Sequence, residues 1–257
     1  MKQTVSNPLI LLAAITALTA PALADYSNDF TSGTDADFTH YSPLQGFGAG
    51  GVYSFPGGGY SISAPASPLP GTLGPGRAAS FLTAQNYGDF NVSYDILGYS
   101  AANAQFMGVF SRVSTPGLGT LNGYAMGLDT TTGQLFISRV QGEQSLGPIG
   151  VSAVSAALTL NPANAYSLSF SAVGSSFTGS LRDKLTGTLL ATVSGTDSTY
   201  ASGELGLGVA AQTFDAGALA QATFDNLSVS AVPEPAGWAF TAAGGLVAFA
   251  WLRRRSK

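Results

Sequence analysis

The carboxylates that could carry acid–base chemistry are few and lie far apart in the chain. Before the last 25 residues the only glutamates are Glu143 and Glu204, which belong to different segments. A glycosidase needs two carboxyl groups at a set separation across the bond that it cleaves. Aspartate pairs remain open as an alternative, but most of the candidates lie in an N-terminal segment that reads as loop: Asp25, Asp29, Asp35 and Asp37. The residues therefore favour a non-catalytic protein, with a hydrolase as the alternative.

His40 is the single histidine, and the chain contains no cysteine. A Ser-His-Asp triad needs its histidine beside a nucleophile, and the Thr39-His40-Tyr41 context carries no nucleophile-elbow pattern. Zinc sites need several histidine or cysteine ligands. We therefore expect His40 to be a surface or strand-edge residue, and no disulfide framework can form.

Calcium is the more plausible use of the acidic residues, because hard cations bind clustered carboxylate and carbonyl oxygens. The candidate ligands are Asp29 near the start of the chain and Asp225 near its end, where a fold that brings the two ends together would place them side by side. The alternative for Asp225 is structural, since its carboxylate can cap the turn that Asn226 continues.

Aromatic side chains are a second set of candidate contacts, because exposed rings can stack on sugars. Five occur in the glycine-rich N-terminal stretch and two near expected strand ends: Tyr41, Phe47, Tyr53, Phe55, Tyr60, Tyr99 and Tyr124. The alternative is that most of them fill the core, since a domain without cysteine or tryptophan needs its Phe and Tyr there.

The elements that position these residues are predicted to be short strands. Residues 42–76 are rich in glycine and proline and are predicted to be mostly loop, with a few short extended pieces such as 59–63. From Arg77 onward, runs with alternating apolar residues recur about every ten residues. The predicted strands cover 78–83, 90–96, 105–113, 123–128, 134–140, 166–172, 176–182, 188–193, 203–211 and 222–230. Between the two chain ends no window favours a helix, so we expect an antiparallel sandwich of two curved sheets, with a barrel as the alternative.

The order of features resembles the concanavalin-A/laminin-G type of jelly roll over about residues 28–230. The resemblance rests on an Asn28-Asp29-Phe30 start, the glycine-rich run 203–209 and the closing run 224–229. It implies an all-β, antiparallel jelly-roll β-sandwich that binds glycans on its concave sheet, often with a structural Ca²⁺. Laminarinase-type hydrolases of this fold carry a Glu-x-Asp-x-(x)-Glu motif, which this chain lacks.

The last 25 residues have the composition of a sorting signal. Pro233-Glu234-Pro235 precedes an uncharged apolar run, 236–252, and a basic tip with Arg253, Arg254 and Arg255. About 17 apolar residues are near the lower limit for a transmembrane helix, and the arginines should stay cytoplasmic. The segment resembles the PEP-CTERM signal of Gram-negative bacteria, which implies recognition of Glu234 and cleavage near the motif by exosortase. The alternatives are an unprocessed single-pass anchor and a buried core helix, although a core helix would not usually end in three arginines at the chain terminus.

The N-terminus predicts a secretory signal peptide. An apolar stretch, 8–20, leads to Ala22-Leu23-Ala24, a small-x-small cleavage site, so the mature chain should begin at Asp25. The predicted organisation is a signal peptide at 1–24, a β-sandwich ectodomain at 25–232 and a sorting signal at 233–257. The precursor would be anchored in the inner membrane, and the mature form would reach the cell surface or the medium.

Composition limits the partners of the ectodomain. It holds thirteen acidic and five basic residues, a net charge of −8. No basic stripe is available for phosphates, so nucleic acid and anionic lipid surfaces are excluded as partners. We expect an exported surface or extracellular-matrix protein, non-catalytic and associated with polysaccharide, whose other partners are exosortase, the Sec machinery and the membrane. The alternatives are a polysaccharide hydrolase with unidentified carboxylates and a purely structural or adhesive envelope protein.

Overall fold

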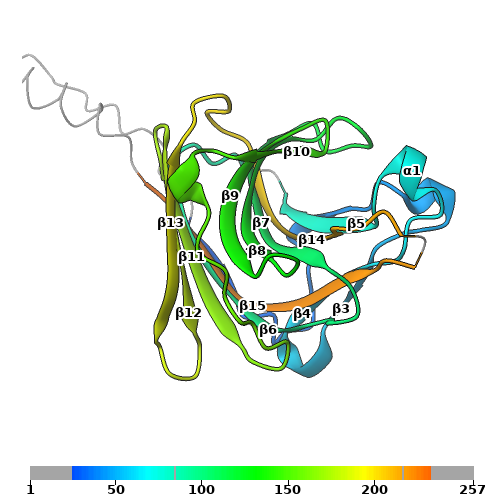
Figure 1. Cartoon of the computed structure of the whole chain (residues 1–257), viewed down its shortest axis with the longest axis horizontal. Helices are drawn as coiled ribbons and strands as arrows, with labels where there is room; N and C mark the ends of the chain where they lie inside the picture. The colour runs from blue at the N-terminus through cyan, green and yellow to red at the C-terminus, as the bar shows by residue number, and fades with distance from the viewer. Residues whose placement is uncertain (1–24, 84, 216, 233–257) are drawn as a thin grey trace, which may run out of the picture. The chain divides into compact units, whose positions relative to one another are not determined.

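The computed structural model describes residues 25–83, 85–215 and 217–232, which form two antiparallel β-sheets packed face to face (Figure 1). The predicted signal peptide, the Pro233-Glu234-Pro235 motif, the apolar run 236–252 and the arginines at 253–255 lie outside these residues. Within the described ranges, every helix is too short or too polar to cross a membrane.

The sheet that we call the outer sheet has eight strands. In spatial order these are β13 (Leu189–Thr196), β12 (Ser176–Asp183), β11 (Tyr166–Val173), β6 (Phe90–Tyr99), β15 (Ala220–Ala231), β4 (Tyr60–Ala64) and β3 (Val52–Ser54), with β1 (Tyr26–Asn28) paired to β15. Because Tyr26 pairs with Val229 in the register of β1 and β15, the first and last described strands lie side by side.

The inner sheet has seven strands, around which the outer sheet curves (Figure 1). Their order is β10 (Gln144–Pro148), β9 (Gln134–Gln141), β8 (Asn122–Asp129), β7 (Gln105–Ser114), β14 (Glu204–Ala211), β5 (Arg77–Leu82) and β2 (Phe38–Tyr41). The described helical segments are single turns: η1 (Gln45–Phe47), η2 (Pro56–Gly58), α1 (Pro70–Leu73) and η3 (Val151–Ala153).

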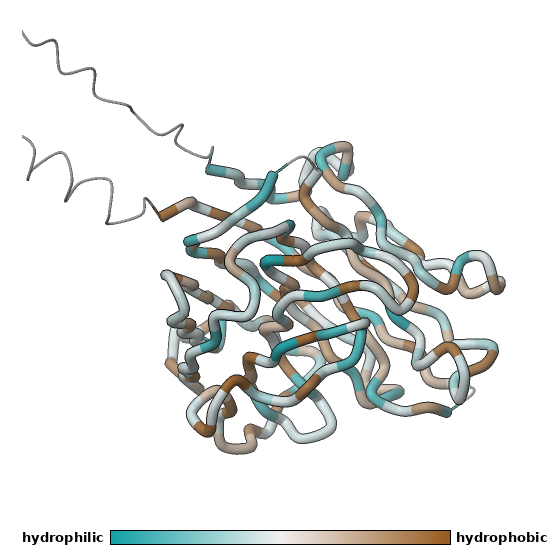
Figure 2. The backbone as a smooth tube through the Cα atoms, turned by 90° about the horizontal axis from the view of Figure 1, so that it is seen from above, coloured by the Kyte–Doolittle hydropathy of each residue, from teal (hydrophilic) through white to brown (hydrophobic). Residues whose placement is uncertain are grey.

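Alternation along the strands decides which side chains face the space between the sheets. In β6, Phe90, Val92 and Tyr94 are buried, whereas Asn91 and Ser93 between them are exposed. The same two-residue period makes hydrophilic and hydrophobic segments alternate along the chain trace in Figure 2. The prediction of an all-β, antiparallel jelly-roll sandwich is confirmed.

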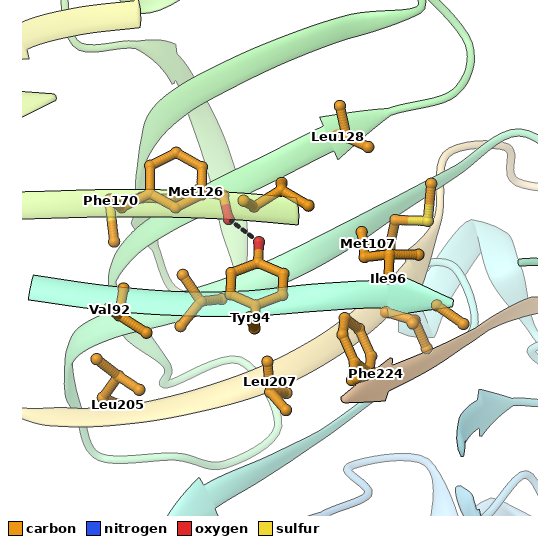
Figure 3. Close-up of a cluster of buried hydrophobic side chains, with 14 of the residues drawn as sticks. Val92, Tyr94, Ile96, Met107, Met126, Leu128, Phe170, Leu205, Leu207 and Phe224 are labelled. Atoms are coloured by element: carbon orange, nitrogen blue, oxygen red, sulfur yellow. Dashed lines mark hydrogen bonds between the residues drawn. The ribbon is translucent and has the colours of Figure 1, made fainter. Parts of the chain in front are cut away.

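The core fills the space between the two sheets. Figure 3 shows Tyr94 of the outer sheet among side chains from both sheets, and its hydroxyl donates a hydrogen bond to the carbonyl of Met126 at 3.4 Å. Burial raises the pKa of this phenol well above its ordinary value. Each fully buried side chain of this size contributes about 1.5–3 kcal/mol relative to an exposed one, so the core supplies most of the driving force for closing the sandwich.

The buried side chain of Arg112 links several segments at one end of the sandwich. The Arg112 guanidinium donates to the carbonyls of Gly88 at 2.9 Å and Tyr200 at 3.2 Å. Its central carbon lies 4.9 Å from the centre of the Phe177 ring, a cation–π contact. Burial lowers the pKa of Arg112, although Asp89 at 3.4 Å partly opposes this effect. All these partners are internal, so Arg112 has a structural role.

The stretch 42–76 is more ordered than its composition predicts. It contains β3 and β4, and Tyr60, Ile62 and Ala64 of β4 are fully buried. The physical reason is tertiary: β4 pairs with β15 from the far end of the chain, a partner that no local pattern can indicate. The extended piece predicted at 59–63 corresponds to β4, whereas strands β1, β2, β3 and β10 were not predicted.

Candidate functional site

A groove of about 860 Å³ lies on the open face of the inner sheet. Its floor is formed by β9, β8, β7, β14 and β5, and residues of β10 and of the α1 segment line its sides. Figure 1 shows β10 and α1 on opposite sides of this face. The groove is the concave face that the sequence resemblance associates with glycan binding.

A row of glycines lies on the same face of the inner sheet as the groove-lining rings Phe106 and Phe110. Gly127 pairs with Gly108, Gly108 pairs with Gly208, and Gly208 pairs with Ala79, so the row crosses four strands. A Cβ atom at Gly208 would lie 2.7 Å from the Phe110 ring and 2.8 Å from the Ala79 methyl carbon. The missing side chain therefore lets the Phe110 ring lie close against the sheet.

Five rings form a continuous strip across this floor, which we call the aromatic strip. The centroid distances are 5.5 Å for Phe136–Phe106, 5.3 Å for Phe106–Phe110, 6.4 Å for Phe110–Phe81 and 5.7 Å for Phe81–Tyr41. Phe110 and Phe136 are half-buried, whereas the other three are buried. These two rings are thus the members of the strip that a ligand can contact.

The charged pair at one end of the groove is fully engaged. Arg77 donates from Nε to Oε1 and from Nη2 to Oε2 of Glu143, both at 2.7 Å. The Tyr41 hydroxyl and the Gly119 backbone N–H also donate to this carboxylate. Burial and the neighbouring carboxylate raise the pKa of Tyr41 far above its ordinary value. This network joins β5, β2, the β7–β8 loop and the β9–β10 turn, and the carboxylate of Glu143 is engaged by several donors within it.

The second carboxylate of the groove is also occupied. Asp129 accepts hydrogen bonds from the Thr131 N–H at 2.7 Å and from the Thr132 hydroxyl at 3.1 Å, which closes the turn between β8 and β9. Glu204 is not among the groove-lining residues, and burial raises its pKa. Ser138 lines the groove with a buried hydroxyl that has no hydrogen-bond partner among the described residues. The groove thus offers a hydroxyl and aromatic faces rather than a pair of available carboxylates.

His40 lies on the edge strand β2, as predicted, with its side chain 43% exposed. Its Nε2 lies 2.6 Å from the Asp35 carboxylate, and its ring stacks on Tyr53 at a centroid distance of 3.6 Å. It is not among the residues that line the groove. Its partners therefore give it a structural role at the sheet edge.

The two candidate calcium ligands are engaged within their own turns. Asp29 accepts from the N–H and hydroxyl of Thr31 at 3.1 and 2.8 Å, and Asp225 accepts from the N–H of Asn226 at 2.8 Å. The described residues contain no group of three or more acidic or histidine side chains that could hold a metal ion. Two carboxylates are fewer than the six to eight oxygen ligands that Ca²⁺ takes. Calcium binding by Asp29 and Asp225 therefore gains no support from their geometry and stays a prediction.

The aromatic residues singled out from the sequence mostly belong to the interior. Tyr60 and Tyr124 are fully buried and Tyr41 is nearly so, while Phe47 is 49% exposed and does not line the groove. The rings that do line it in β7 and β9 were missed. Their signal was the spacing Phe106-x-Gly108-x-Phe110, which places two rings and a glycine on one face of a strand. Both faces of β7 are apolar, so the strand reads as an interior one.

No protein-family model and no curated protein matches this chain. Among solved structures, the carbohydrate-binding module CBM66 from Bacillus subtilis aligns over 76% of this chain and 96% of its own, with 16% identity and a TM-score of 0.52. A β-1,3-1,4-glucanase (lichenase) from a mouse hindgut metagenome aligns over 81% and 99%, with 11% identity and a TM-score of 0.55. The lectin UEA-II, complexed with galactose, aligns over 81% and 98%, with 10% identity and a TM-score of 0.54. The protein therefore has a lectin-like, concanavalin-like jelly-roll fold.

Proposed function

We propose that the sandwich binds polysaccharide in the groove of the inner sheet and does not cleave it. The observation that carries this proposal is the aromatic strip on the inner sheet, with Phe110 and Phe136 half-buried at the groove surface. Ligand sites combine an apolar, aromatic lining with a few polar groups that fix orientation. The structural neighbours support the same reading, since they include a carbohydrate-binding module, a lectin and a glucanase.

The absence of catalysis is part of the proposal. Glycoside hydrolysis needs one carboxyl group able to donate a proton and a second able to attack or to activate water. Glu143 is held by Arg77, and Asp129 closes its own turn, so neither groove carboxylate is available for these roles. The glucanase neighbour shows that the fold can host cleavage, and the alternative is tested by measuring release of reducing ends.

The binding site is tested by shortening the two half-buried rings. Phe110→Ala with Phe136→Ala should weaken binding to soluble glucans at least about tenfold, since loss of stacked aromatic contact costs on the order of 1–3 kcal/mol. The readout is retardation in native gels that contain the polysaccharide. Leu185→Ala removes an exposed apolar side chain from the β12–β13 turn, 94% exposed, and is the matched control. Unchanged retardation of the double variant would remove the groove as the site.

The route to the cell surface is the second component of the proposal. Export through the Sec pathway with cleavage after Ala24, a transient C-terminal transmembrane helix, and exosortase processing near Pro233-Glu234-Pro235 rest on the sequence pattern of the two ends. Mass spectrometry of the protein from its own cells tests this route. A C-terminus between Val232 and Pro235 in an extracellular fraction supports sorting, and an intact Lys257 in the inner membrane refutes it.

A further inference from the structure

The exposed face of the outer sheet carries an ordered array of short polar side chains. Five neighbouring strands, β15, β6, β11, β12 and β13, pair in register and place these side chains in two rows. The first row is Ser228, Ser93, Ser169, Ser180 and Thr192, and the second is Ser230, Asn91, Ser171, Thr178 and Ser194. We call these ten residues the hydroxyl array.

All ten side chains line one hollow of about 640 Å³. Each of the ten positions is exposed or half-buried. The residues between them, such as Val92, Phe170 and Val193, are buried in the core and contribute only the floor between the two rows. Ser152 of η3 adds a further hydroxyl to the same lining. The array is therefore a hollowed surface built by five strands and not a scatter of surface serines.

The array has unused hydrogen-bonding capacity. In the part of the chain that the structure describes, one hydrogen bond joins two of its members, Ser169 Oγ to Ser180 Oγ at 2.8 Å. Each hydroxyl can donate one hydrogen bond and accept two. Neither row contains a charged or an aromatic residue, whereas an ordinary solvated face carries charges of both signs. The chemistry suits a polymer that itself presents many hydroxyl groups.

The net charge of the domain and the pairing of its cations indicate which class of polymer it can bind. Within the described residues, four of the five cations are paired with carboxylates: Arg77, Arg112, Arg139 and Lys184. The fifth, Arg182, donates to the carbonyl of Gly187. With a net charge of −8 over residues 25–232, the domain repels an acidic polysaccharide and offers it no cluster of cations. A neutral polysaccharide meets no such barrier.

The spacing of the array favours a single chain over a flat crystalline surface. Adjacent strands lie about 4.8 Å apart and side chains on one face of a strand about 6.7 Å apart, so each row spans about 19 Å and a chain lying between the rows can contact both. Adjacent strands in a sheet rotate by about 20° relative to one another, so the exposed face rotates by about 80° from the first of the five strands to the last. A soluble chain can follow this turn, whereas a rigid flat surface cannot.

We infer that the hydroxyl array is a second binding face, which takes a neutral polysaccharide chain across the strands of the outer sheet. This inference extends the proposed function, since both faces then bind polysaccharide. The two faces lie on opposite sheets and differ in chemistry, aromatic in the groove and hydroxylic on the array. One molecule could thus hold two chains and cross-link a polysaccharide matrix.

The test removes hydroxyls from the centre of the array in residues 25–232, which lie in one compact unit. Ser93→Ala, Ser169→Ala, Thr178→Val and Ser180→Ala are combined. The control combines Ser114→Ala with Thr131→Val, two exposed hydroxyls outside both faces. Retardation is measured in native gels that contain dextran, laminarin or alginate, and circular dichroism verifies that each variant is folded.

We expect the fourfold variant to bind dextran or laminarin at least about tenfold more weakly than the wild type, because several hydrogen bonds are lost together. The control should bind as the wild type does, and alginate should retard neither. Wild-type retardation of the fourfold variant, an equal loss in the control, or binding of alginate as strong as that of the neutral glucans would overturn the inference.

The groove variants separate this inference from the proposed function. If Phe110→Ala with Phe136→Ala abolishes retardation while the fourfold variant retains it, the groove is the site and the array is not. If only the fourfold variant loses retardation, the array is the site and the groove proposal fails. Retardation of the wild type by none of the glucans would count against both.

Discussion

At the scale of single residues, the glycines of the groove floor determine what the inner sheet can present. Gly208 has no unusual backbone angle, and its importance is steric, because any Cβ there would collide with the Phe110 ring and the Ala79 methyl carbon. A Cβ atom at Gly108 or Gly127, its neighbours in the row, would lie at comparably short distances from backbone atoms of the adjacent strand. The absence of a side chain at Gly208 thus sets how closely the Phe110 ring can lie against the sheet.

Substituting Gly208 by valine should both destabilise the sandwich and displace Phe110. Overpacking of this kind costs about 1–3 kcal/mol, and a displaced ring should also weaken glucan binding. Urea denaturation of the wild type and of Gly208→Val measures the first effect, and gel retardation measures the second. Gly46→Ala is the matched control, since a Cβ at Gly46 meets no atom within 4 Å. Equal stability of Gly208→Val and Gly46→Ala would contradict this account of the floor.

At the scale of elements, the carboxylate of Asp95 connects four neighbouring segments of the outer sheet through hydrogen bonds and an ion pair. Asp95 of β6 accepts hydrogen bonds from Ser167 of β11 at 2.5 Å and from Asn226 of β15 at 2.8 Å. The ammonium of Lys184, just after β12, lies 2.8 Å from the same carboxylate. Burial alone would raise the pKa of Asp95, but these partners outweigh burial and hold the pKa below its ordinary value.

This depressed pKa fixes the sign of a pH dependence. A carboxyl group that is more acidic in the folded state contributes stability above its unfolded pKa of about 3.9, and that contribution is lost as the pH falls through the folded pKa. Asp95→Asn should therefore lower the free energy of unfolding by about 1 kcal/mol at neutral pH, and the difference should shrink toward about pH 3. Denaturation with guanidinium at several pH values measures it.

A double-mutant cycle identifies the partner that matters most. Lys184→Met removes the ammonium, and if the two groups are coupled, the effects of Asp95→Asn and Lys184→Met will not add. Additive effects at neutral pH would assign the stabilisation to Ser167 and Asn226 instead. A pH-independent difference between Asp95→Asn and the wild type would contradict the electrostatic explanation altogether.

At the scale of the whole molecule, the engaged cations predict how binding responds to salt. Binding that neutralises phosphates or carboxylates weakens steeply with salt, because counterions are released. Here all five Lys and Arg of the described residues bond to other groups of the protein, and the lining of the hydroxyl array contains no charged residue. Raising NaCl from about 0.05 M to about 0.5 M should therefore change the affinity for a neutral glucan less than about twofold. Titration calorimetry measures this, and a loss of tenfold or more would indicate an ionic mode of binding.

Much of the architecture could be predicted because it depends on local periodicity. Tyr166 to Val173 alternates buried and outward positions as the sequence indicated, and the strands from Arg77 onward follow the same rule. An extended piece at 59–63 was predicted, but the full burial of Tyr60 to Ala64 was not, because it depends on pairing with a strand near the other end of the chain. The nature of His40 as a strand-edge residue was also predictable, since nothing near it in the sequence could act with it.

By itself, the sequence determined the fold class and the lack of cysteine chemistry, because these depend on composition and on short-range order. Export, sorting and the expectation that nucleic acid is not a partner remain predictions. Only the tertiary structure decided which side chains meet. Gly127, Gly108 and Gly208 form one row, and Ser228 and Thr192 end another, because strand register aligns residues from segments far apart in the chain. The physical reason is that pairing between distant strands depends on the closure of the whole core. A local sequence pattern does not indicate with which distant strand a segment will pair.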